Sequence, residues 1–573
     1  MVGGPGSGTG SRFSQSGLEV EDALTLPNLQ WMGSHTVKTG LRFQNIKLSA
    51  KDQSDKLEDA SYFFLVGPTG TSTTPYEVQF PVVLSGLAST KVDSTDKQYG
   101  FYLQDDWRVN DHLELNLGVR WDYERVPIWE NYVTPKAIVA AINGPFNPAT
   151  PLTPALSYAQ VLALGGPNYP GVAINNYIST GSNRSSPKDQ WQPRLGFSYD
   201  INADQKNVVF GGYGRSYDRN LLDTLSLETT KVALNGNPQI YFPNPLNIDD
   251  FGPCKTAADI NPAKHCYVWN DAYLTAAGLA SISVAPNSHE VDLINNNIKN
   301  PYSDQFSLGF RHQMGDWSTA ITIADVRSYN TIMGHWGNRY ANGHFYDSTG
   351  NQWGGAGVPG FGALILWDNG GKDEDRSVGV LLEKPYTKES GWSTTIAYTY
   401  SDATQNNFSG QNDGYAVNYN QYFFDAPYPS DFKMLPSNAI PKHRLVATYS
   451  HDAPWGVSVA GKLTLETPIA VGGAYGCPAV CTPYGGTTVE VSGNIPQTIG
   501  YRDLDLQATK DFKLWSTGSA YVRLDLLNVF DYYNFDNNSA TWSKNPGSIP
   551  QYNTGGAFNG VPRTLKLSLG MKW

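Results

Sequence analysis

Apolar and polar residues alternate along many short stretches of the chain. At the C-terminal end, in T-L-K-L-S-L-G-M-K-W, every second residue from Leu565 to Trp573 is apolar, and the residues between them are polar or small. Successive side chains of a β-strand point to opposite faces, so this pattern predicts a strand with one wholly apolar face. The stretch 113–123 alternates over six consecutive apolar positions. This length is close to the ~9–11 residues with which a tilted strand crosses a bilayer.

The same alternation predicts fifteen strands in total. Six hairpins supply twelve of them, two more precede the hairpins, and one follows. Around 208–213, glycine pairs blur the pattern and indicate either a bulge or a close approach of two backbones. The predicted strands are 18–29, 36–44, 98–109, 113–123, 192–201, 207–217, 304–313, 317–329, 376–386, 392–402, 443–450, 457–466, 502–512, 519–530 and 564–573.

Short turns alternate with long connections along the whole chain. This predicts an all-β, transmembrane, antiparallel up-and-down β-barrel with short periplasmic turns and long extracellular loops. In a soluble propeller or sandwich, the alternative fold, long loops would not sort to one side. The long connections are roughly 49–97, 125–189, 218–300, 330–372, 403–441, 467–500 and 531–559.

Tryptophan lies beside the short turns. Indole prefers the membrane interface, so this placement predicts an aromatic girdle at the periplasmic rim, although any one of these residues can equally be ordinary packing. The expected girdle is Trp31, Trp107, Trp317, Trp392, Trp455, Trp515 and Trp573. The residues expected to face lipid are Leu113, Leu115, Leu117, Val119, Leu504, Leu506, Leu565, Leu567 and Leu569.

Composition narrows the class of protein. Charged residues are 16 % of the 573 and aromatic residues 13 %, with 57 Gly, which is typical of strands and turns. No apolar run approaches the ~18 residues of a spanning helix. A net charge of −11 argues against a nucleic-acid partner, because binding to phosphates needs basic patches.

The beginning of the chain predicts that strands are missing. Residues 1–17 are rich in Gly and Ser and indicate a linker or remnant loop, and no signal peptide is recognisable there. Closed single-chain bacterial barrels usually have an even number of strands. We therefore expect residues 18–573 to be the C-terminal part of a larger barrel, with about fifteen of a probable 22 strands, without plug domain or signal peptide.

Several motifs resemble one family of barrels. Y-G-F-Y-L-Q-D-D-W-R-V at 99–109, L-N-L-G-V-R-W-D at 115–122, P-R-L-G-F-S-Y at 193–199 and L-D-L-L-N-V-F-D at 524–531 resemble TonB-dependent receptors. G-S-H-T-V-K-T-G-L-R-F at 33–43 and the long loops look most like the Oar-like branch. The resemblance covers roughly residues 18–573.

This resemblance implies a transporter that moves a solute or polypeptide across the outer membrane. The family has a 22-stranded barrel closed by an N-terminal plug and is energised by an inner-membrane complex that binds an N-terminal box; neither plug nor box matches any stretch here. Other expected partners are outer-membrane lipid and, through the C-terminal strand, the barrel assembly machinery. The alternatives are a passive porin-like channel and a secreted β-rich carbohydrate-binding protein.

The four cysteines form two local pairs in different connections, Cys254 with Cys266 and Cys477 with Cys481. Outside the cell thiols oxidise, so we expect two disulfides within loops. Metal binding is the alternative, since His265 adjoins Cys266, but a four-cysteine site requires the two connections to meet.

Other candidate chemistry is sparse. The acidic run Asp368–Asp375 suits a hard cation but lacks EF-hand spacing, so a solvated acidic loop is the alternative. Asp503 and Asp505 fit a polar lumen better than a catalytic pair. No zinc-protease, nucleophile-elbow or phosphate-loop motif occurs, so we expect neither enzyme activity nor a cofactor. An aromatic run expected either to stack on a ligand or to pack against neighbouring loops is Tyr415, Tyr419, Tyr422, Phe423, Phe424 and Tyr428.

Overall fold

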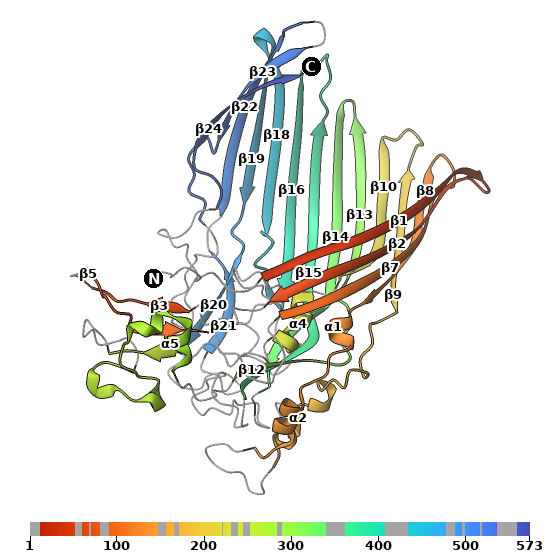
Figure 1. Ribbon diagram of the computed structural model, residues 1–573. Coiled ribbons are helices and arrows are strands. Elements are labelled where there is room, and N and C mark those ends of the chain that lie inside the picture. The colour runs from red at the N-terminus through yellow and green to blue at the C-terminus, as the bar shows by residue number, and fades with distance from the viewer. Residues whose placement is uncertain are drawn as a thin grey trace.

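A long, curved antiparallel sheet dominates the computed structural model (Figure 1). The structure describes residues 12–51, 60–67, 70–80, 91–146, 156–165, 171–219, 222–230, 239–243, 253–282, 289–337, 339, 361–406, 434–476, 488–495, 499–515, 518–535 and 559–572.

The sheet contains seventeen strands, of which β12 (His289–Ile294) and β17 (Leu435–Pro436) are short additions at its loop side. Each of the other fifteen pairs antiparallel with the next along the chain. They are β1 (Arg12–Gln30), β2 (Ser34–Lys51), β7 (Lys91–Arg108), β8 (Leu113–Arg125), β9 (Gln190–Asp200), β10 (Asn207–Tyr217), β13 (Tyr302–Met314), β14 (Trp317–Trp336), β15 (Phe361–Lys384), β16 (Trp392–Gln405), β18 (His443–Ala453), β19 (Val457–Glu466), β22 (Tyr501–Lys513), β23 (Ser519–Leu527) and β24 (Thr564–Lys572).

All fifteen predicted strands are confirmed, but five of them, β1, β2, β7, β14 and β15, extend at their loop-side ends by six residues or more beyond the predicted bounds. Strand β1 begins at Arg12, inside the predicted linker, because the long strand β2 offers partners as far as Lys51. Strand β15 begins at Phe361, so the acidic run Asp368–Asp375 lies in a strand and is not a loop. It is held there by pairing with the loop-side end of β14.

The short turns all lie at one end of the sheet, and the long connections lie at the other (Figure 1). The sheet curls around a hollow, but among the described residues β1 and β24 do not pair with each other. Both edge strands run from the loop side to the turn side, because β1 leads into the turn at Trp31 and β24 follows a long connection. An antiparallel closure therefore needs an odd number of further strands.

The glycine pairs of β10 mark a close approach, since the strand pairs without a bulge on both sides. A Cβ on Gly211 would lie 2.6 Å from the backbone oxygen of Ser307, and one on Gly212 would lie 2.7 Å from that of Leu195. Of the two alternatives for these glycines, the tight packing of neighbouring backbones is the one observed.

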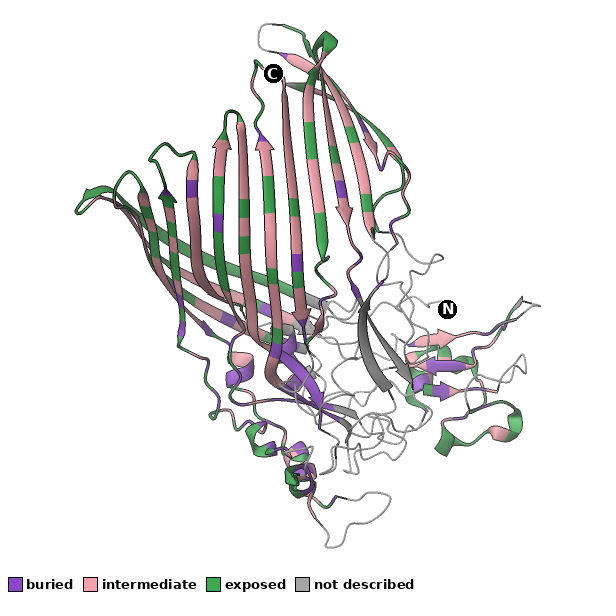
Figure 2. Ribbon diagram, turned by 180° about the vertical axis from the view of Figure 1, so that it is seen from behind, coloured by how far each residue is buried: buried purple, intermediate pink, exposed green. Residues whose placement is uncertain are grey.

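Part of the long connections folds into a compact unit that the periodicity did not predict. This unit, the cap, consists of α1, α2, α3, α4, β12 and the loop-side ends of β14 and β15, with β12 parallel to β15. Alternate residues of β15 enter two different cores, since Ile365 and Trp367 pack with α1 and α4, and Leu364 and Leu366 pack with α2 and α3. Buried residues accordingly gather at this end (Figure 2).

The helices are short. None of those described is long and apolar enough to span a membrane. They are α1 (Pro127–Glu130), α2 (Lys136–Asn143), α3 (Tyr158–Ala163), α4 (Leu222–Thr230) and α5 (Ala276–Ala280), with 3-10 turns η2 (Ile174–Asn176), η4 (Ala257–Asp259), η5 (Pro262–Lys264), η6 (Asp271–Leu274) and η8 (Pro454–Gly456).

A second small unit, the lobe, contains a three-stranded sheet and the disulfide between Cys254 and Cys266. Its core includes Val78, Phe80, Ile240 and Phe242. The sheet is formed by β3 (Ser61–Phe63), β6 (Glu77–Gln79) and β11 (Gln239–Tyr241); separate hairpins are β4 (Val66–Gly67) with β5 (Gly70–Thr71), and β20 (Ala470–Gly476) with β21 (Thr488–Asn494).

Candidate functional site

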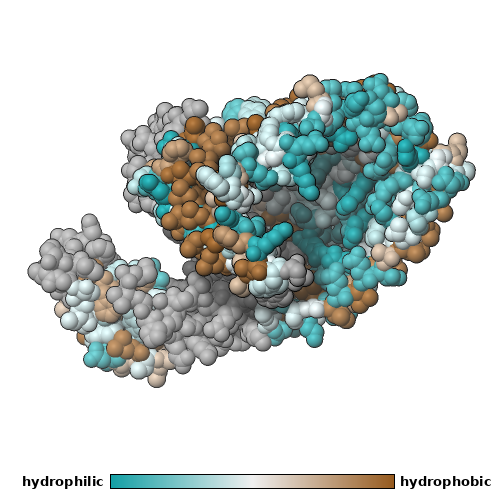
Figure 3. All heavy atoms as spheres, turned by 90° about the horizontal axis from the view of Figure 1, so that it is seen from above, coloured by the Kyte–Doolittle hydropathy of each residue, from teal (hydrophilic) through white to brown (hydrophobic). Residues whose placement is uncertain are grey.

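The inner face of the sheet is polar, and several of its charges are paired. Lys38 Nζ donates to Asp106 Oδ2 at 2.8 Å, and Arg120 donates two hydrogen bonds to Asp122 at 2.7 and 2.8 Å. Arg42 Nε donates to Glu19 Oε1 at 2.6 Å. Hydrophilic side chains line the hollow when the sheet is viewed from the turn side (Figure 3). Such a polar wall suits a water-filled passage.

A missing side chain makes room for one of these pairs. Gly100 lies on the inner face of β7, and a Cβ there would come within 2.8 Å of both Arg120 Nη2 and Asp122 Oδ1. The C-terminal strands β19 and β22 also place opposite charges side by side on the inner face, since Asp505 lies opposite Lys462 in their register. Asp503 and Asp505 thus face the hollow, as a polar lumen requires.

The outer face of the sheet is apolar and exposed. Leu567 is 62 % exposed, and its register partner on β23, Leu524, is also apolar. Leu115 and Leu504 are half-buried and belong to none of the three buried hydrophobic cores. Leu117, Leu506, Leu565 and Leu569 are exposed, whereas Leu113 and Val119 are half-buried. No dry core covers this face within the described residues, which excludes packing of these leucines against a second sheet there.

The expected girdle residues within the described part lie beside the short turns. Trp31 flanks the first turn, and the His35 ring stacks on Trp107 at 5.1 Å between ring centroids. Trp317 and Trp392 come from neighbouring hairpins and meet edge to face at 5.8 Å. Trp455 and Trp515 are exposed at their turns. Trp573 lies outside the described residues.

Charged pairs bound the apolar band at its loop side. On the outer face of β10 and β13, Phe306 lies next to Tyr213, and one step further Arg215 pairs with Asp304 at 2.7 Å. The Arg215 guanidinium lies 4.4 Å from the ring centroid of Tyr302. On β14, Arg327 pairs with Asp325 at 2.7 Å. On β10, β13 and β14 the outer face is therefore apolar between the short turns and these ion pairs.

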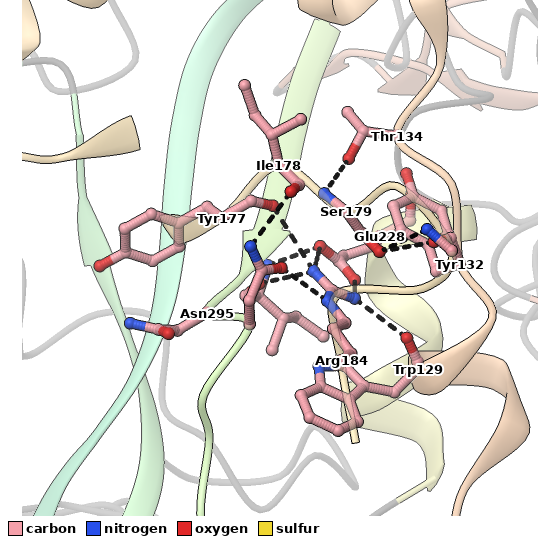
Figure 4. A network of polar contacts seen from close by, with 12 residues as sticks. Trp129, Tyr132, Thr134, Tyr177, Ile178, Ser179, Arg184, Glu228 and Asn295 are labelled. Atoms are coloured by element: carbon pink, nitrogen blue, oxygen red, sulfur yellow. Dashed lines mark hydrogen bonds and ion pairs between the residues drawn. The ribbon is translucent and has the colours of Figure 1, made fainter. Parts of the chain in front are cut away.

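A buried ion pair organises the cap (Figure 4). Arg184 Nη1 and Nη2 donate to the two carboxylate oxygens of Glu228 at 2.6 and 2.9 Å, and the two side chains are 0 % and 1 % exposed. The remaining donors of Arg184 reach Asn296 Oδ1 at 2.8 Å and the backbone oxygen of Ile294 at 2.7 Å. The backbone N–H of Ile294 donates to Glu228 Oε1 at 2.7 Å. Three distant segments thus share one polar centre.

The surroundings of this pair are aromatic. The Arg184 guanidinium lies 5.4 Å from the Trp129 ring centroid and 5.7 Å from that of Tyr132. Burial, with the nearby Glu228 charge, raises the pKa of Tyr132 well above its ordinary value, so its hydroxyl stays protonated and donates to the Glu228 backbone oxygen at 2.7 Å. A fully bonded guanidinium between aromatic rings makes a rigid centre for the cap.

The cap is anchored to the inner face of the sheet. Leu48 of β2 points inward and packs with Leu225 and Leu227 of α4. Asn300, which precedes β13, donates to Glu124 Oε2 of β8 at 3.1 Å. The cap therefore stands over the loop-side mouth of the hollow.

One expected disulfide falls within the described residues. Cys254 and Cys266 are bonded, with Cα atoms 5.6 Å apart. Cys477 and Cys481 lie outside the described residues, as does the aromatic run from Tyr415 to Tyr428. Among the described residues, no group of three or more His, Cys, Asp and Glu side chains is placed to hold a metal ion.

The first residue of the acidic run, Asp368, forms hydrogen bonds within the cap. Asp368 accepts hydrogen bonds from the Tyr177 hydroxyl, from Asn295 Nδ2 at 2.6 Å and from His335 Nε2 at 2.8 Å. The sequence suggested either a cation site or a solvated acidic loop for this run. Both were wrong at Asp368, because hydrogen-bond donors of the protein surround its carboxylate. Sequence reasoning also missed Arg184 and Glu228, since a single Arg and Glu in long loops carry no periodic signal.

Comparison with known protein families and solved structures agrees with a barrel wall. The family model of the outer membrane beta barrel domain matches residues 2–468. No curated protein sequence matches the chain.

Solved structures are similar to this chain at low sequence identity. The outer membrane transporter YddB from Escherichia coli is 12 % identical, with a TM-score of 0.52 over 98 % of this chain and 54 % of that one. The ferripyoverdine receptor of the Pseudomonas aeruginosa outer membrane is 14 % identical, with a TM-score of 0.45 over 98 % and 48 %. The ferric enterobactin receptor of the same organism is 14 % identical, with a TM-score of 0.45, and the match covers 98 % of this chain and 54 % of that one. The chain spans about half the length of these proteins.

Proposed function

The chain belongs to the outer membrane β-barrel domain family, and from this premise we propose that it is the barrel portion of a TonB-dependent receptor that moves a solute or polypeptide across the outer membrane. The outer face of the sheet meets hydrocarbon, and the short turns lie in the periplasm. The long connections face the exterior, where the cap meets the ligand first. The assignment to the Oar-like branch stays a prediction.

One observation carries the proposal: the cap has its own hydrophobic cores and is fixed to the inner wall of the hollow. A passive porin-like channel, the second candidate, needs a mouth that stays open to small solutes. A folded unit over the mouth instead suits a receptor that selects a ligand before transport. The third candidate, a secreted carbohydrate-binding protein, conflicts with the exposed apolar band on the outer face.

Energisation belongs to the same proposal. In this class of receptor, an inner-membrane complex grips a segment N-terminal to the barrel, and the barrel is occluded by a plug. The half-length match to the solved transporter supports the inference that further strands complete the wall, and so do β1 and β24, which each pair with one strand only among the described residues. The barrel assembly machinery, recruited by the C-terminal strand, is the expected partner during insertion.

Liposome swelling tests the proposal against a porin. The complete gene product, purified in detergent and reconstituted, is expected to leave small sugars outside, whereas a porin reconstituted in parallel admits them. Swelling at the rate of the porin would overturn the receptor assignment. In cells, uptake through the receptor is expected to stop when a protonophore collapses the proton gradient, and uptake that continues would refute energised transport.

Expression of residues 1–573 behind a signal peptide tests the missing strands. Unpaired backbone groups are costly in lipid, so we expect the product to be degraded in the periplasm. A heat-modifiable, protease-resistant band in outer membranes would show that this chain closes without additional strands.

A further inference from the structure

The apolar band of the outer face ends at one row on the neighbouring strands β7 and β8. On β7, Phe101 and Tyr99 are exposed on this face, and the next residue of the same parity is Lys97. Neither β2 nor β8 shifts its register against β7, so the faces of the three strands stay in phase. The outer face of β8 changes at the same row, from Tyr123 to Arg125. Cations therefore follow the aromatic residues at the loop-side edge of the band, where lipid headgroups lie.

These cations are crowded and few acids balance them. Lys97 lies directly opposite Arg125 in the register of β7 and β8, and Lys47 of β2 follows one row further toward the loop side. Arg125 Nε donates to Glu130 Oε2 at 3.0 Å, but neither lysine has an ion pair within the described part of the chain. Like charges directly opposite each other destabilise a sheet. At the same edge of β10, β13 and β14, the arginines described above are each paired with an aspartate at 2.7 Å. An anionic group bound between β7 and β8 would relieve the repulsion.

A groove of about 610 Å³ opens directly beyond this row, and Lys47 belongs to both. Five of its lining residues are Ser or Thr from β1, β2 and β7. Lys47, Asn131 and Asp93 add charged and amide groups, and Leu48 and two residues of α1 form an apolar side. Hydroxyl, amide and carboxylate groups together can donate to and accept from the hydroxyl groups of a sugar. The volume lies within the roughly 300–1,000 Å³ of small-molecule sites. The groove therefore fits a sugar headgroup beside the anion.

We propose that the outer face of β2, β7 and β8 binds a phosphorylated glycolipid of the outer leaflet at this edge. Lys47, Lys97 and Arg125 hold its phosphate through charge-assisted hydrogen bonds. Its sugars enter the groove, and its acyl chains lie along the apolar band. Because the cations continue directly from that band, the occupant is a membrane lipid and not a soluble sugar phosphate. The inference goes beyond the proposed function, since this lipid lies outside the wall and is not transported; it requires only that the long connections face the exterior.

Native mass spectrometry tests the site in the complete receptor, extracted in mild detergent and freed of lipid. Three probes are titrated: lipid A, which carries both phosphates and sugars, lipid A from which a phosphatase has removed the phosphates, and phosphatidylglycerol, which has a phosphate but no sugar. We expect saturable binding of lipid A. Each of the other two lipids should bind at least about tenfold more weakly, because each lacks one of the two groups that the edge and the groove recognise.

The double variant Lys47→Gln, Lys97→Gln should bind lipid A at least about tenfold more weakly than the wild type. Arg327→Gln is the matched control, because Arg327 lies on the outer face at the same edge but is already paired with Asp325. It should bind like the wild type.

Binding by the double variant equal to that of the wild type would overturn the proposal. So would equally tight binding of phosphatidylglycerol by the wild type, since an unselective lipid layer would then cover the edge. The comparison of the three lipids on the wild type decides even if a variant fails to fold. Failure of the swelling or protonophore test would refute the transport function and leave this result unchanged.

Discussion

Replacing Arg184 by Met should unfold the cap locally while leaving the wall strands paired. The substitution keeps much of the apolar stem but removes the guanidinium, which makes two hydrogen bonds to Glu228 and others to Asn296 and Ile294. Glu228 would then be a buried charge without its counter-ion. Breaking such a pair from one side costs about 3–5 kcal/mol.

Hydrogen exchange with mass spectrometry measures this cost by segment. At 1.4 kcal/mol for each tenfold change, exchange of the protected amides in α4 and β12 should accelerate by about 10²- to 10⁴-fold. Amides in β22 and β23, the fourth and fifth strands along the sheet from β15, should keep their protection. The double variant Arg184→Met, Glu228→Met should recover part of the loss, because no uncompensated charge remains.

Arg125→Met is the matched control. Arg125 also pairs with a cap glutamate, Glu130, at 3.0 Å, but its side chain is half exposed. Exposed pairs contribute about 0–1 kcal/mol, so exchange in the cap should change by less than about tenfold. If Arg184→Met accelerates exchange no more than Arg125→Met does, the buried pair is not what holds the cap together, and the reasoning fails.

Three further predictions follow from the wall, the lobe and the cap. Leu567→Lys should lower the amount of folded barrel in outer membranes, since Lys facing the bilayer centre costs about 2–4 kcal/mol, whereas Ser568→Lys on the inner face should not; equal yields in heat-modifiability gels would contradict the assigned faces. Cys254→Ser should destabilise the lobe by about 2–4 kcal/mol, seen as faster proteolysis within 253–282, and a reductant should reproduce this in the wild type only. Burial opposes the charged form of Glu130, but hydrogen bonds from Ser186 and Arg125 outweigh it and hold the pKa of Glu130 below its ordinary value of 4.5. Its contribution to cap stability is therefore complete above about pH 4.5 and is lost as the pH falls below that value, so the melting temperatures of wild type and Glu130→Gln should converge in acid; a constant difference would refute this.

The sequence by itself determined the wall. A two-residue period is a local signal, and it placed all fifteen long strands as well as the inner and outer faces, including Leu567 outside and Asp505 inside. Hairpin partners are neighbours along the chain, so the strand order followed from the turns alone. The polar inner wall, which is one part of the candidate site, was therefore predictable from the sequence.

Only the tertiary structure decided the cap and what it covers. Arg184 and Glu228 are 44 residues apart, and β12 joins β15 in parallel, so neither leaves a short-range pattern. The acidic run from Asp368 became a strand because β14 continues past the apolar band and supplies backbone partners. Contacts of this kind arise from distant segments that bury one another, and local periodicity carries no information about them.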